Sequence, residues 1–258
     1  MPHRLLRRIL VLGGTSEASE LARLLAAHGL CATLSYAGRT ENPRAQPIPT
    51  RVGGFGGVEG LAAYLRAEGI THLVDATHPF AATMSANACA AAQLAGVPLV
   101  ALTRPAWEAQ EGDRWREVAT IAQAVEALAG APRRVFLALG RQHVEAFAAQ
   151  PQHRYVLRFV DAPGEAPALP DHALVVDRGP FTVAGDRALM EAHGIECIVA
   201  KNAGGSGAQA KLEAARALGL PVIMIARPAL PPRMEVHRAV DVLDWLDHAP
   251  PSGAERGV

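Results

Sequence analysis

Short apolar runs alternate with stretches of helical periodicity along most of the chain, and this alternation limits the possible folds more than any other feature. In the first hundred residues it predicts strands at 9–12, 32–36, 72–76 and 98–102, and helices at 17–28, 58–68 and 81–95. Strands that are apolar throughout are typical of parallel sheets covered on both faces. The pattern therefore predicts an α/β fold with mainly parallel sheets flanked by helices.

The alternation pauses and then resumes. Residues 103–115 have no period and are interpreted as part of a connector. Beyond them the pattern predicts strands at 134–139, 155–160, 173–176, 197–200 and 222–226, and helices at 121–129, 182–193, 208–218 and 240–247. We therefore expect two domains of similar build, at 1–105 and 119–258, joined by a connector at 106–118.

Composition excludes several classes of protein. Lys plus Arg number 25 and Asp plus Glu number 25, so the formal net charge is zero, which argues against a nucleic-acid binder. The 3 cysteines are widely spaced and lack a CxxC pair, which favours a reducing cytoplasm and no disulfide framework. Gly, Pro or charge interrupts every apolar run before it reaches the length of a membrane span, so we expect no membrane association. No set of His and Cys has metal-ligand spacing, so we expect no metal.

The turn after the first predicted strand resembles a dinucleotide fingerprint. On the pattern G-x-G-x-x-G/A, Gly13 takes the first position, Thr15 replaces the second glycine and Ala18 takes the third. Gly14 could supply the room that the middle glycine normally gives, while Thr15, Ser16 and the first helix amides could donate to phosphate oxygens. A tight strand-to-helix turn without a ligand is the alternative interpretation.

Two further segments favour a coenzyme. The second strand is followed by Gly38, Arg39 and Thr40, where an NAD-binding domain usually has a carboxylate, and a guanidinium suits the 2′-phosphate of NADP(H). A solvated loop arginine is the alternative. The glycine cluster 53–57, including Gly53 and Gly54, suggests close approach of backbone to the dinucleotide, with a flexible surface loop as the alternative.

Residues 75–80 lie at the carboxyl end of the strand predicted at 72–76, at the edge where open α/β sheets place their ligand crevice. His78 is a candidate proton donor because its pKa range allows proton transfer near neutral pH, although most single histidines are structural. Asp75 is interpreted as a cap of the turn, and Thr77 is predicted to contact the coenzyme.

Cations also follow the later strands. The segment 201–207 lies between a strand and a helix but lacks the order of a P-loop, so it suits a carboxylate better than a nucleotide phosphate. Each cation alone could be a surface charge, whereas several in one crevice would form a polyanion site. The candidate substrate-binding residues are Arg104, Arg141, Arg178, Lys201, Asn202 and Arg227.

Together these segments resemble the precorrin-6A reductase family of cobalamin biosynthesis. The resemblance is carried, in order along nearly the whole chain, by residues 13–18, 38–40, 53–57, 75–80, 85, 87, 104–105, 179–181, 201–205 and 221–228.

The resemblance implies an enzyme of porphyrin and corrin metabolism that acts on a CH–CH bond and uses NADPH to reduce precorrin-6A to precorrin-6B. Hydride is then delivered to C19 and a proton to C18. It implies two Rossmann-like domains, the first holding NADPH and the second contributing the tetrapyrrole site, and it allows an exchange of terminal strands between them. It also allows transient contact with the next enzyme of the pathway.

Other interpretations stay open at this point. A reductase of the cobalt-loaded substrate would carry the same motifs, because the metal would arrive inside the ring. A nucleotide-sensing module without catalysis would need only the first crevice. An unrelated NADP-dependent dehydrogenase is disfavoured by the missing Tyr-x-x-x-Lys spacing of the short-chain type. The proton could come from His78, from solvent or from a substrate carboxyl group.

Overall fold

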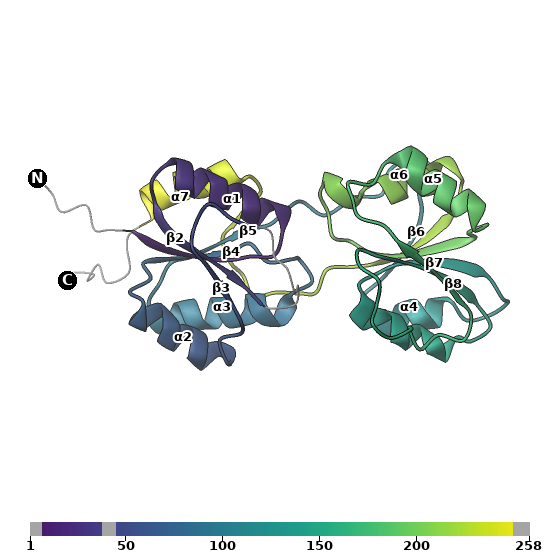
Figure 1. Cartoon of the computed structure of the whole chain (residues 1–258), viewed down its shortest axis with the longest axis horizontal. Coiled ribbons are helices and arrows are strands. Elements are labelled where there is room, and N and C mark those ends of the chain that lie inside the picture. Colours follow the sequence, from purple (N-terminus) through teal and green to yellow (C-terminus); the bar gives the residue numbers. More distant parts are fainter. Residues whose placement is uncertain (1–6, 38–44, 250–258) are drawn as a thin grey trace, which may run out of the picture. The chain divides into compact units, whose positions relative to one another are not determined.

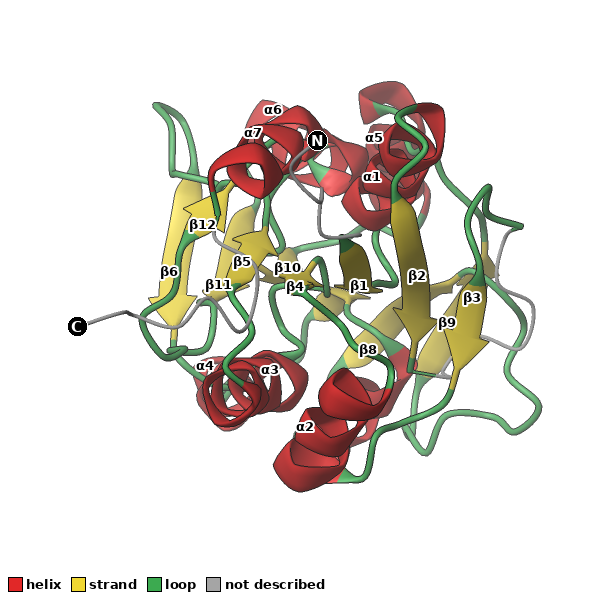
Figure 2. Ribbon diagram, turned by 90° about the vertical axis from the view of Figure 1, so that its left-hand side faces the viewer, coloured by secondary structure: helices red, strands yellow, loops and turns green. Residues whose placement is uncertain are grey.

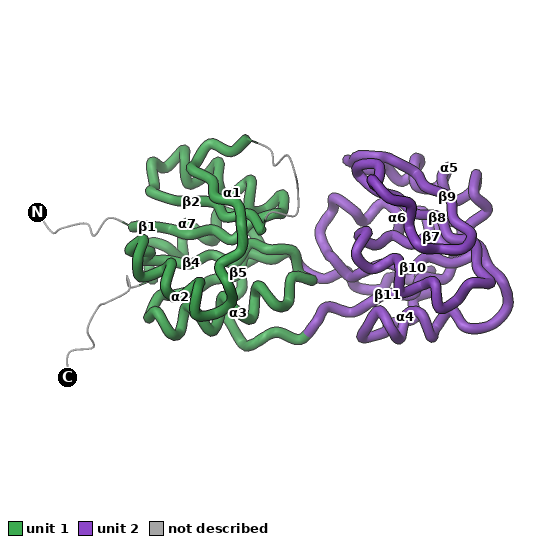
Figure 3. Tube along the Cα trace, turned by 60° about the horizontal axis from the view of Figure 1, so that its bottom comes forward, with its two compact units in different colours: residues 1–104, 229–258 green, residues 105–228 purple. Residues whose placement is uncertain are grey.

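The computed structural model describes residues 7–37 and 45–249 of the 258-residue chain. Gly38, Arg39 and Thr40 lie outside the described residues. The chain forms two compact units, the first from residues up to Arg104 together with those from Ala229 onward, and the second from Pro105 to Pro228 (Figure 3).

The first unit contains a six-stranded sheet with the order β12-β5-β4-β1-β2-β3, in which every pair of neighbours is parallel. Its strands are β1 (Arg8–Leu12), β2 (Cys31–Tyr36), β3 (Thr50–Val52), β4 (His72–Asp75), β5 (Leu99–Leu102) and β12 (Glu235–Val236). The order reverses between β1 and β4, which is the switch point where such sheets open a ligand crevice.

Helices cover both faces of this sheet (Figure 1). They are α1 (Ser16–Ala27) and α7 (Ala239–His248) on one face, and α2 (Gly57–Ala67) and α3 (Ala82–Ala95) on the other. Residues of β1 alternate between the two cores: Ile9 and Val11 pack towards α1 and α7, and Leu10 and Leu12 towards α2 and α3. Burial of both faces explains why β1 is apolar throughout.

The second unit repeats the arrangement with the strand order β6-β11-β10-β7-β8-β9, again entirely parallel. Its strands are β6 (Arg114–Val118), β7 (Arg134–Ala138), β8 (Arg154–Phe159), β9 (His172–Val176), β10 (Cys197–Lys201) and β11 (Pro221–Ile225). Its helices are α4 (Ile121–Ala127), α5 (Val183–Ala192) and α6 (Ala210–Ala217), with 3₁₀ turns η1 (Arg141–Ala149) and η2 (Ser206–Ala208). Figure 2 shows helices on both sides of the strands.

One edge strand of each sheet comes from a segment that follows, in the sequence, a strand of the other unit. After β5 of the first unit, the chain adds β6 to the second sheet beside β11, and after β11 it returns to add β12 beside β5. The exchange of terminal strands that the resemblance allows is therefore confirmed.

The exchange corrects the predicted domain boundaries. Residues 106–118 are not merely a connector, because they contain β6, and residues from Ala229 onward belong to the first unit rather than to a domain 119–258. The sequence pattern predicted neither β6 nor β12, and each omission has a physical reason. β6 reads Arg-Trp-Arg-Glu-Val at a sheet edge and lacks an apolar run, and β12 has only two residues. No helix in the described part of the chain is long and apolar enough to cross a bilayer.

Candidate functional site

The turn between β1 and α1 is shaped by two glycines with different tasks. A Cβ on Gly13 would lie 2.6 Å from the Leu34 Cδ1 atom, so any larger residue would have to displace this buried side chain of β2. Gly14 has a φ of +120°, and a Cβ built on it would meet no atom within 4 Å. The backbone at Gly14 therefore faces open space.

Thr15, at the position of the missing middle glycine, is the N-cap of α1. Its hydroxyl accepts a 3.1 Å hydrogen bond from the Ala18 amide and donates a 2.8 Å bond to the Ala76 carbonyl. The hydroxyl is thus used within the protein, whereas the first amides of a helix have no carbonyl partner four residues earlier in that helix. An open glycine backbone followed by the amides of Ser16 and Glu17, which precede the capped Ala18 amide, fits a pyrophosphate.

The glycine cluster 53–57 is held by Arg51, a residue that the sequence analysis did not select. Its guanidinium donates to Ser35 Oγ at 2.8 Å, to the Gly53 carbonyl at 3.0 Å and to the Gly54 carbonyl at 3.2 Å. The same guanidinium lies 3.9 Å from the ring centroid of Phe55. The carbonyls of Gly53 and Gly54 therefore face Arg51, and a coenzyme contact at these residues would use other backbone atoms.

The end of β4 carries a buried polar cluster. Asp75 Oδ1 accepts from the Thr77 amide at 3.1 Å and from the Thr77 hydroxyl at 2.7 Å, and Oδ2 accepts from Arg233 at 2.6 Å. The Thr77 and Ser85 hydroxyl oxygens are 3.3 Å apart. The interpretation of Asp75 as the cap of this turn agrees with these bonds.

His78 follows in the same turn and is exposed. Its Nδ1 accepts a 3.2 Å hydrogen bond from the Phe80 amide. An imidazole that accepts at Nδ1 carries its proton on Nε2 when it is neutral. His78 can therefore present an N–H donor at the carboxyl edge of the sheet.

Arg104 follows β5 and belongs to the first unit, unlike the other candidate anchors. Its guanidinium lies 3.5 Å from the Glu17 carboxylate in the first turn of α1. The structure therefore brings Arg104 to the start of α1, beside the predicted coenzyme turn.

The segment after β10 is tied to the start of the second unit. The Asn202 side chain accepts from the Trp107 amide and donates to the Trp107 carbonyl, each at 2.8 Å. Arg227 donates to the carbonyls of Asn202 at 3.0 Å and Ala203 at 3.1 Å. A Cβ on Gly204 would lie only 2.1 Å from the Pro105 carbonyl oxygen. Asn202 and Arg227 therefore shape this loop, which begins directly after Lys201.

Arg141 and Arg178 follow β7 and β9 and are exposed. The Arg178 guanidinium is 2.9 Å from Asp161, and the Arg141 guanidinium is 5.7 Å from the ring centroid of Phe159. Like Lys201, Asn202 and Arg227, they lie at or just after the carboxyl end of a strand of one parallel sheet, so the structure brings all five to the same edge.

Sequence reasoning missed another cation at this edge. Arg158, near the end of β8, is nearly buried, forms an ion pair with Asp186 and lies 3.6 Å from the ring centroid of Phe181. Arg158 stands inside an apolar strand, and a charge in such a run is the signal that could have found it. Among the described residues no cluster of His, Cys, Asp and Glu could hold a metal ion.

The parallel strand order and the open glycine turn at a helix start define a dinucleotide-binding protein of the Rossmann class. The family model described as Precorrin-6x reductase CbiJ/CobK matches residues 8–247. The chain belongs to this family, which confirms the resemblance seen in its sequence. As a member, it is an oxidoreductase of cobalamin biosynthesis, and the family indicates a nicotinamide coenzyme.

Individual relatives agree with this assignment. The chain is 58% identical over 248 residues to Precorrin-6A reductase of Rhodobacter capsulatus, covering 95% of this chain and 99% of the relative. It is 30% identical to Cobalt-precorrin-6A reductase of Priestia megaterium over 86% of this chain and 91% of the relative. A solved structure described as CobK precorrin-6A reductase matches with a TM-score of 0.89 and 57% identity, covering 98% of this chain and 100% of that one.

Proposed function

We propose that the protein uses NADPH to reduce one double bond of the precorrin-6A macrocycle, giving precorrin-6B by addition of hydride at C19 and a proton at C18. The observation that carries the proposal is the 58% identity to a precorrin-6A reductase over 99% of that relative's length. Identity to the cobalt-precorrin-6A reductase of Priestia megaterium is 30%, which favours the metal-free substrate.

NADPH fits the residues of the first crevice. The backbone from Gly13 to Ser16 would hold the pyrophosphate, with Thr15 contributing its main chain because its hydroxyl caps α1. Arg39 and Thr40, outside the described residues, would hold the 2′-phosphate, with Gly38 giving the backbone room to approach. When bound, NADPH supplies the hydride.

The turn after β4 would face the reacting end of the coenzyme. Thr77 is held by Asp75, so its contribution to binding would be to fix the shape of this turn. His78 would donate a hydrogen bond to the substrate from Nε2. As the proton source for C18 it would have to act as the imidazolium, with Nδ1 protonated and released from the Phe80 amide. Solvent and a substrate carboxyl group are the competing proton sources.

The second unit would contribute the anchors of the tetrapyrrole. Precorrins carry several acetate and propionate groups on an apolar ring, and charge-assisted bonds from separate cations would fix the ring's orientation. Arg141, Arg178 and Lys201 would make direct contacts, while Asn202 and Arg227 would hold the loop after β10 in shape. Arg104 would contribute one further carboxylate contact.

The decisive experiment mixes purified protein, NADPH and anaerobically prepared precorrin-6A and follows the absorbance of the reduced nicotinamide. We expect its loss in proportion to the precorrin-6B formed. Coenzyme binding without turnover would contradict the proposal and favour a nucleotide sensor. Cobalt-loaded substrate in a parallel reaction separates the two reductases, and we expect the metal-free ring to be reduced with the higher kcat/KM.

A further inference from the structure

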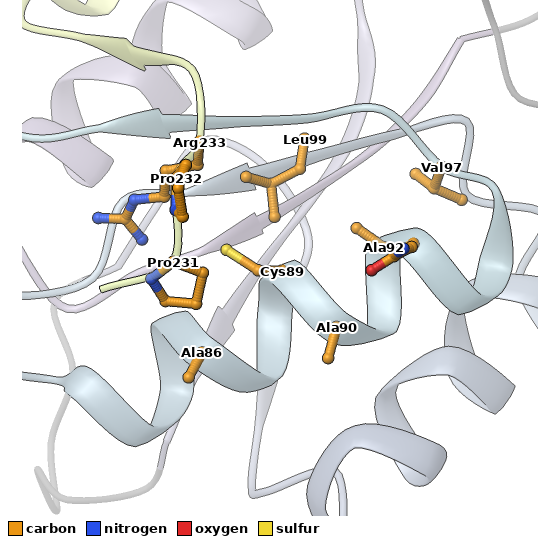
Figure 4. Close-up of a pocket in the computed structure, with 10 residues that line it drawn as sticks. Ala86, Cys89, Ala90, Ala92, Val97, Leu99, Pro231, Pro232 and Arg233 are labelled. Carbon is orange, nitrogen blue, oxygen red and sulfur yellow. The ribbon is translucent and has the colours of Figure 1, made fainter. Parts of the chain in front are cut away.

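The segment that returns from the second unit crosses helix α3 before it forms β12. Pro231 and Pro232 restrict the backbone of this segment, and Arg233 follows them directly. Figure 4 shows the three residues above α3, with Ala86 and Cys89 on the helix below them. The small side chains of α3 leave room for the segment and for a groove of about 440 Å³ beside it.

Arg233 lies in a connecting segment, yet its side chain is buried against a buried carboxylate. Its side chain is 7% exposed and that of its partner Asp75 is 1% exposed, with 2.6 Å between Nη1 and Oδ2. Its Nε also donates to Glu235 at 3.1 Å. Because a buried carboxylate is costly without a charged partner, loss of Arg233 would leave the Asp75 carboxylate without the cation that pairs with it.

The bonds continue from Asp75 into the turn at the carboxyl edge of the sheet. The ionised Asp75 can only accept, so the hydroxyl of Thr77 must donate to it. The Ser85 hydroxyl is then the donor to the Thr77 oxygen. Arg233 is thus connected, through Asp75, to the hydrogen bonds that hold Thr77, the residue immediately before His78.

We propose that Arg233 is a positioning residue for the coenzyme crevice, acting through Asp75 to hold the turn of Thr77 and His78 in its binding shape. The inference rests on the proposed function, since it assigns that turn to the reacting end of NADPH. It also gives the exchanged C-terminal segment a role beyond adding β12. The turn after β4 has all its contacts only once the C-terminal segment, which carries Arg233, has joined the first unit.

The test compares Arg233→Met and Arg233→Lys with Arg7→Met in the full-length protein. Arg7 belongs to the same unit and forms an exposed pair with Asp247 at 2.7 Å, so its loss controls for removal of an arginine ion pair. Two quantities are measured: the Kd of NADPH by fluorescence titration, and amide hydrogen exchange in peptides covering residues 75–81 and in peptides of the second unit.

For Arg233→Met we expect the Kd of NADPH to rise at least about tenfold, the loss typical of a charge-assisted hydrogen bond. Exchange should accelerate in residues 75–81 and stay unchanged in peptides of the second unit. Arg233→Lys keeps the charge but loses the fork of donors, so its Kd should lie between those of the wild type and Arg233→Met. If Arg233→Met does not fold, Arg233→Lys alone decides through the same two measurements.

The inference is overturned if both Arg233 variants bind NADPH as tightly as Arg7→Met does, with unchanged exchange at residues 75–81. It is also overturned if exchange accelerates throughout both units and not chiefly at residues 75–81, since that marks a general loss of structure. Failure of the proposed function looks different. The wild type would then bind NADPH without reducing precorrin-6A, and the binding and exchange measurements would still decide the role of Arg233.

Discussion

The hydroxyl of Thr15 donates a 2.8 Å hydrogen bond to the carbonyl oxygen of Ala76, and in doing so joins the first strand-to-helix turn to the end of β4. The two segments flank the switch point of the sheet, where β1 and β4 are neighbours. A threonine therefore occupies the position of the middle glycine in the usual fingerprint because it connects the two walls of the crevice. Gly14, one residue earlier, leaves the backbone open in its place.

Two replacements of Thr15 test whether its hydroxyl stabilises the protein. Thr15→Ala loses both the N-cap bond to Ala18 and the bond to Ala76, so we expect a loss of about 1–2 kcal/mol in the free energy of unfolding. The Kd of NADPH should rise as the turn loosens. Thr15→Ser keeps the hydroxyl and should stay close to the wild type. Urea unfolding and fluorescence titration measure both effects, and equal stability of the two variants would contradict the capping role.

The coenzyme preference can be tested at Arg39. A guanidinium that binds the 2′-phosphate favours NADPH only, so Arg39→Ala should weaken NADPH binding by about 10- to 100-fold and leave NADH binding nearly unchanged. Titrations with both coenzymes measure the ratio of the two Kd values. Arg187→Ala, an exposed arginine on α5 of the second unit, is the control. Equal weakening of NADH and NADPH would show that Arg39 does not recognise the 2′-phosphate.

Much of the fold was predictable because apolar period and turn chemistry are local properties of the sequence. The strand predicted at 72–76 is β4, His72–Asp75, and the helix predicted at 81–95 is α3, Ala82–Ala95. The assignment of β6 and β12 was not predictable in this way. Each pairs with a sheet made from a distant part of the chain, and neither has an apolar run of its own.

The candidate site divides along the same line. Parallel strands bring their carboxyl ends to one edge, so turns after β1 and β4 could be assigned to one crevice from sequence alone. The role of Arg233 could not be predicted, because its partner Asp75 is 158 positions away. The contact exists only because the C-terminal segment packs on the first unit. Asn202 was predicted as a substrate-binding residue, but the binding of its side chain to the backbone of Trp107 could not be predicted, because this contact also depends on distant packing.

Stability in mild acid should depend on His72. This residue of β4 is fully buried, its Nδ1 lies 2.9 Å from the Thr71 hydroxyl, and its ring packs edge-on against Trp245 at 5.4 Å. Burial lowers the pKa of His72 from the ordinary value of 6.5. The unfolded chain therefore takes up a proton at a pH where the folded protein does not. Proton uptake favours the unfolded state, so the free energy of unfolding decreases as the pH falls below 6.5.

His72→Phe removes that titration while keeping a ring in the core. Between pH 7 and pH 5 the variant should lose stability less steeply than the wild type, by up to about 1.4 kcal/mol per pH unit, the limit for one proton. Urea unfolding at several pH values measures the two slopes. Above pH 7.5 the difference between the two proteins should be constant. Parallel curves down to pH 5 would exclude His72 as the source.

Lys201 gives the sharpest test of the proposed tetrapyrrole site. It is the last residue of β10 and directly precedes the loop that Asn202 and Arg227 hold in shape. Lys201→Gln removes the charge and keeps a long polar side chain, so the KM of precorrin-6A should rise about tenfold or more, as for loss of a charge-assisted bond. The Kd of NADPH should not change, because the coenzyme turn belongs to the first unit.

The matched control for Lys201→Gln is Arg187→Gln, which removes one exposed positive charge from the same unit. If bulk charge attracted the substrate, both variants would raise the KM of precorrin-6A to a similar extent, and the effect would fade with added salt. If Lys201 binds one carboxylate directly, only its variant should raise the KM, and the increase should persist at moderate ionic strength because contact pairs are screened less. An unchanged KM for Lys201→Gln would remove it from the substrate site.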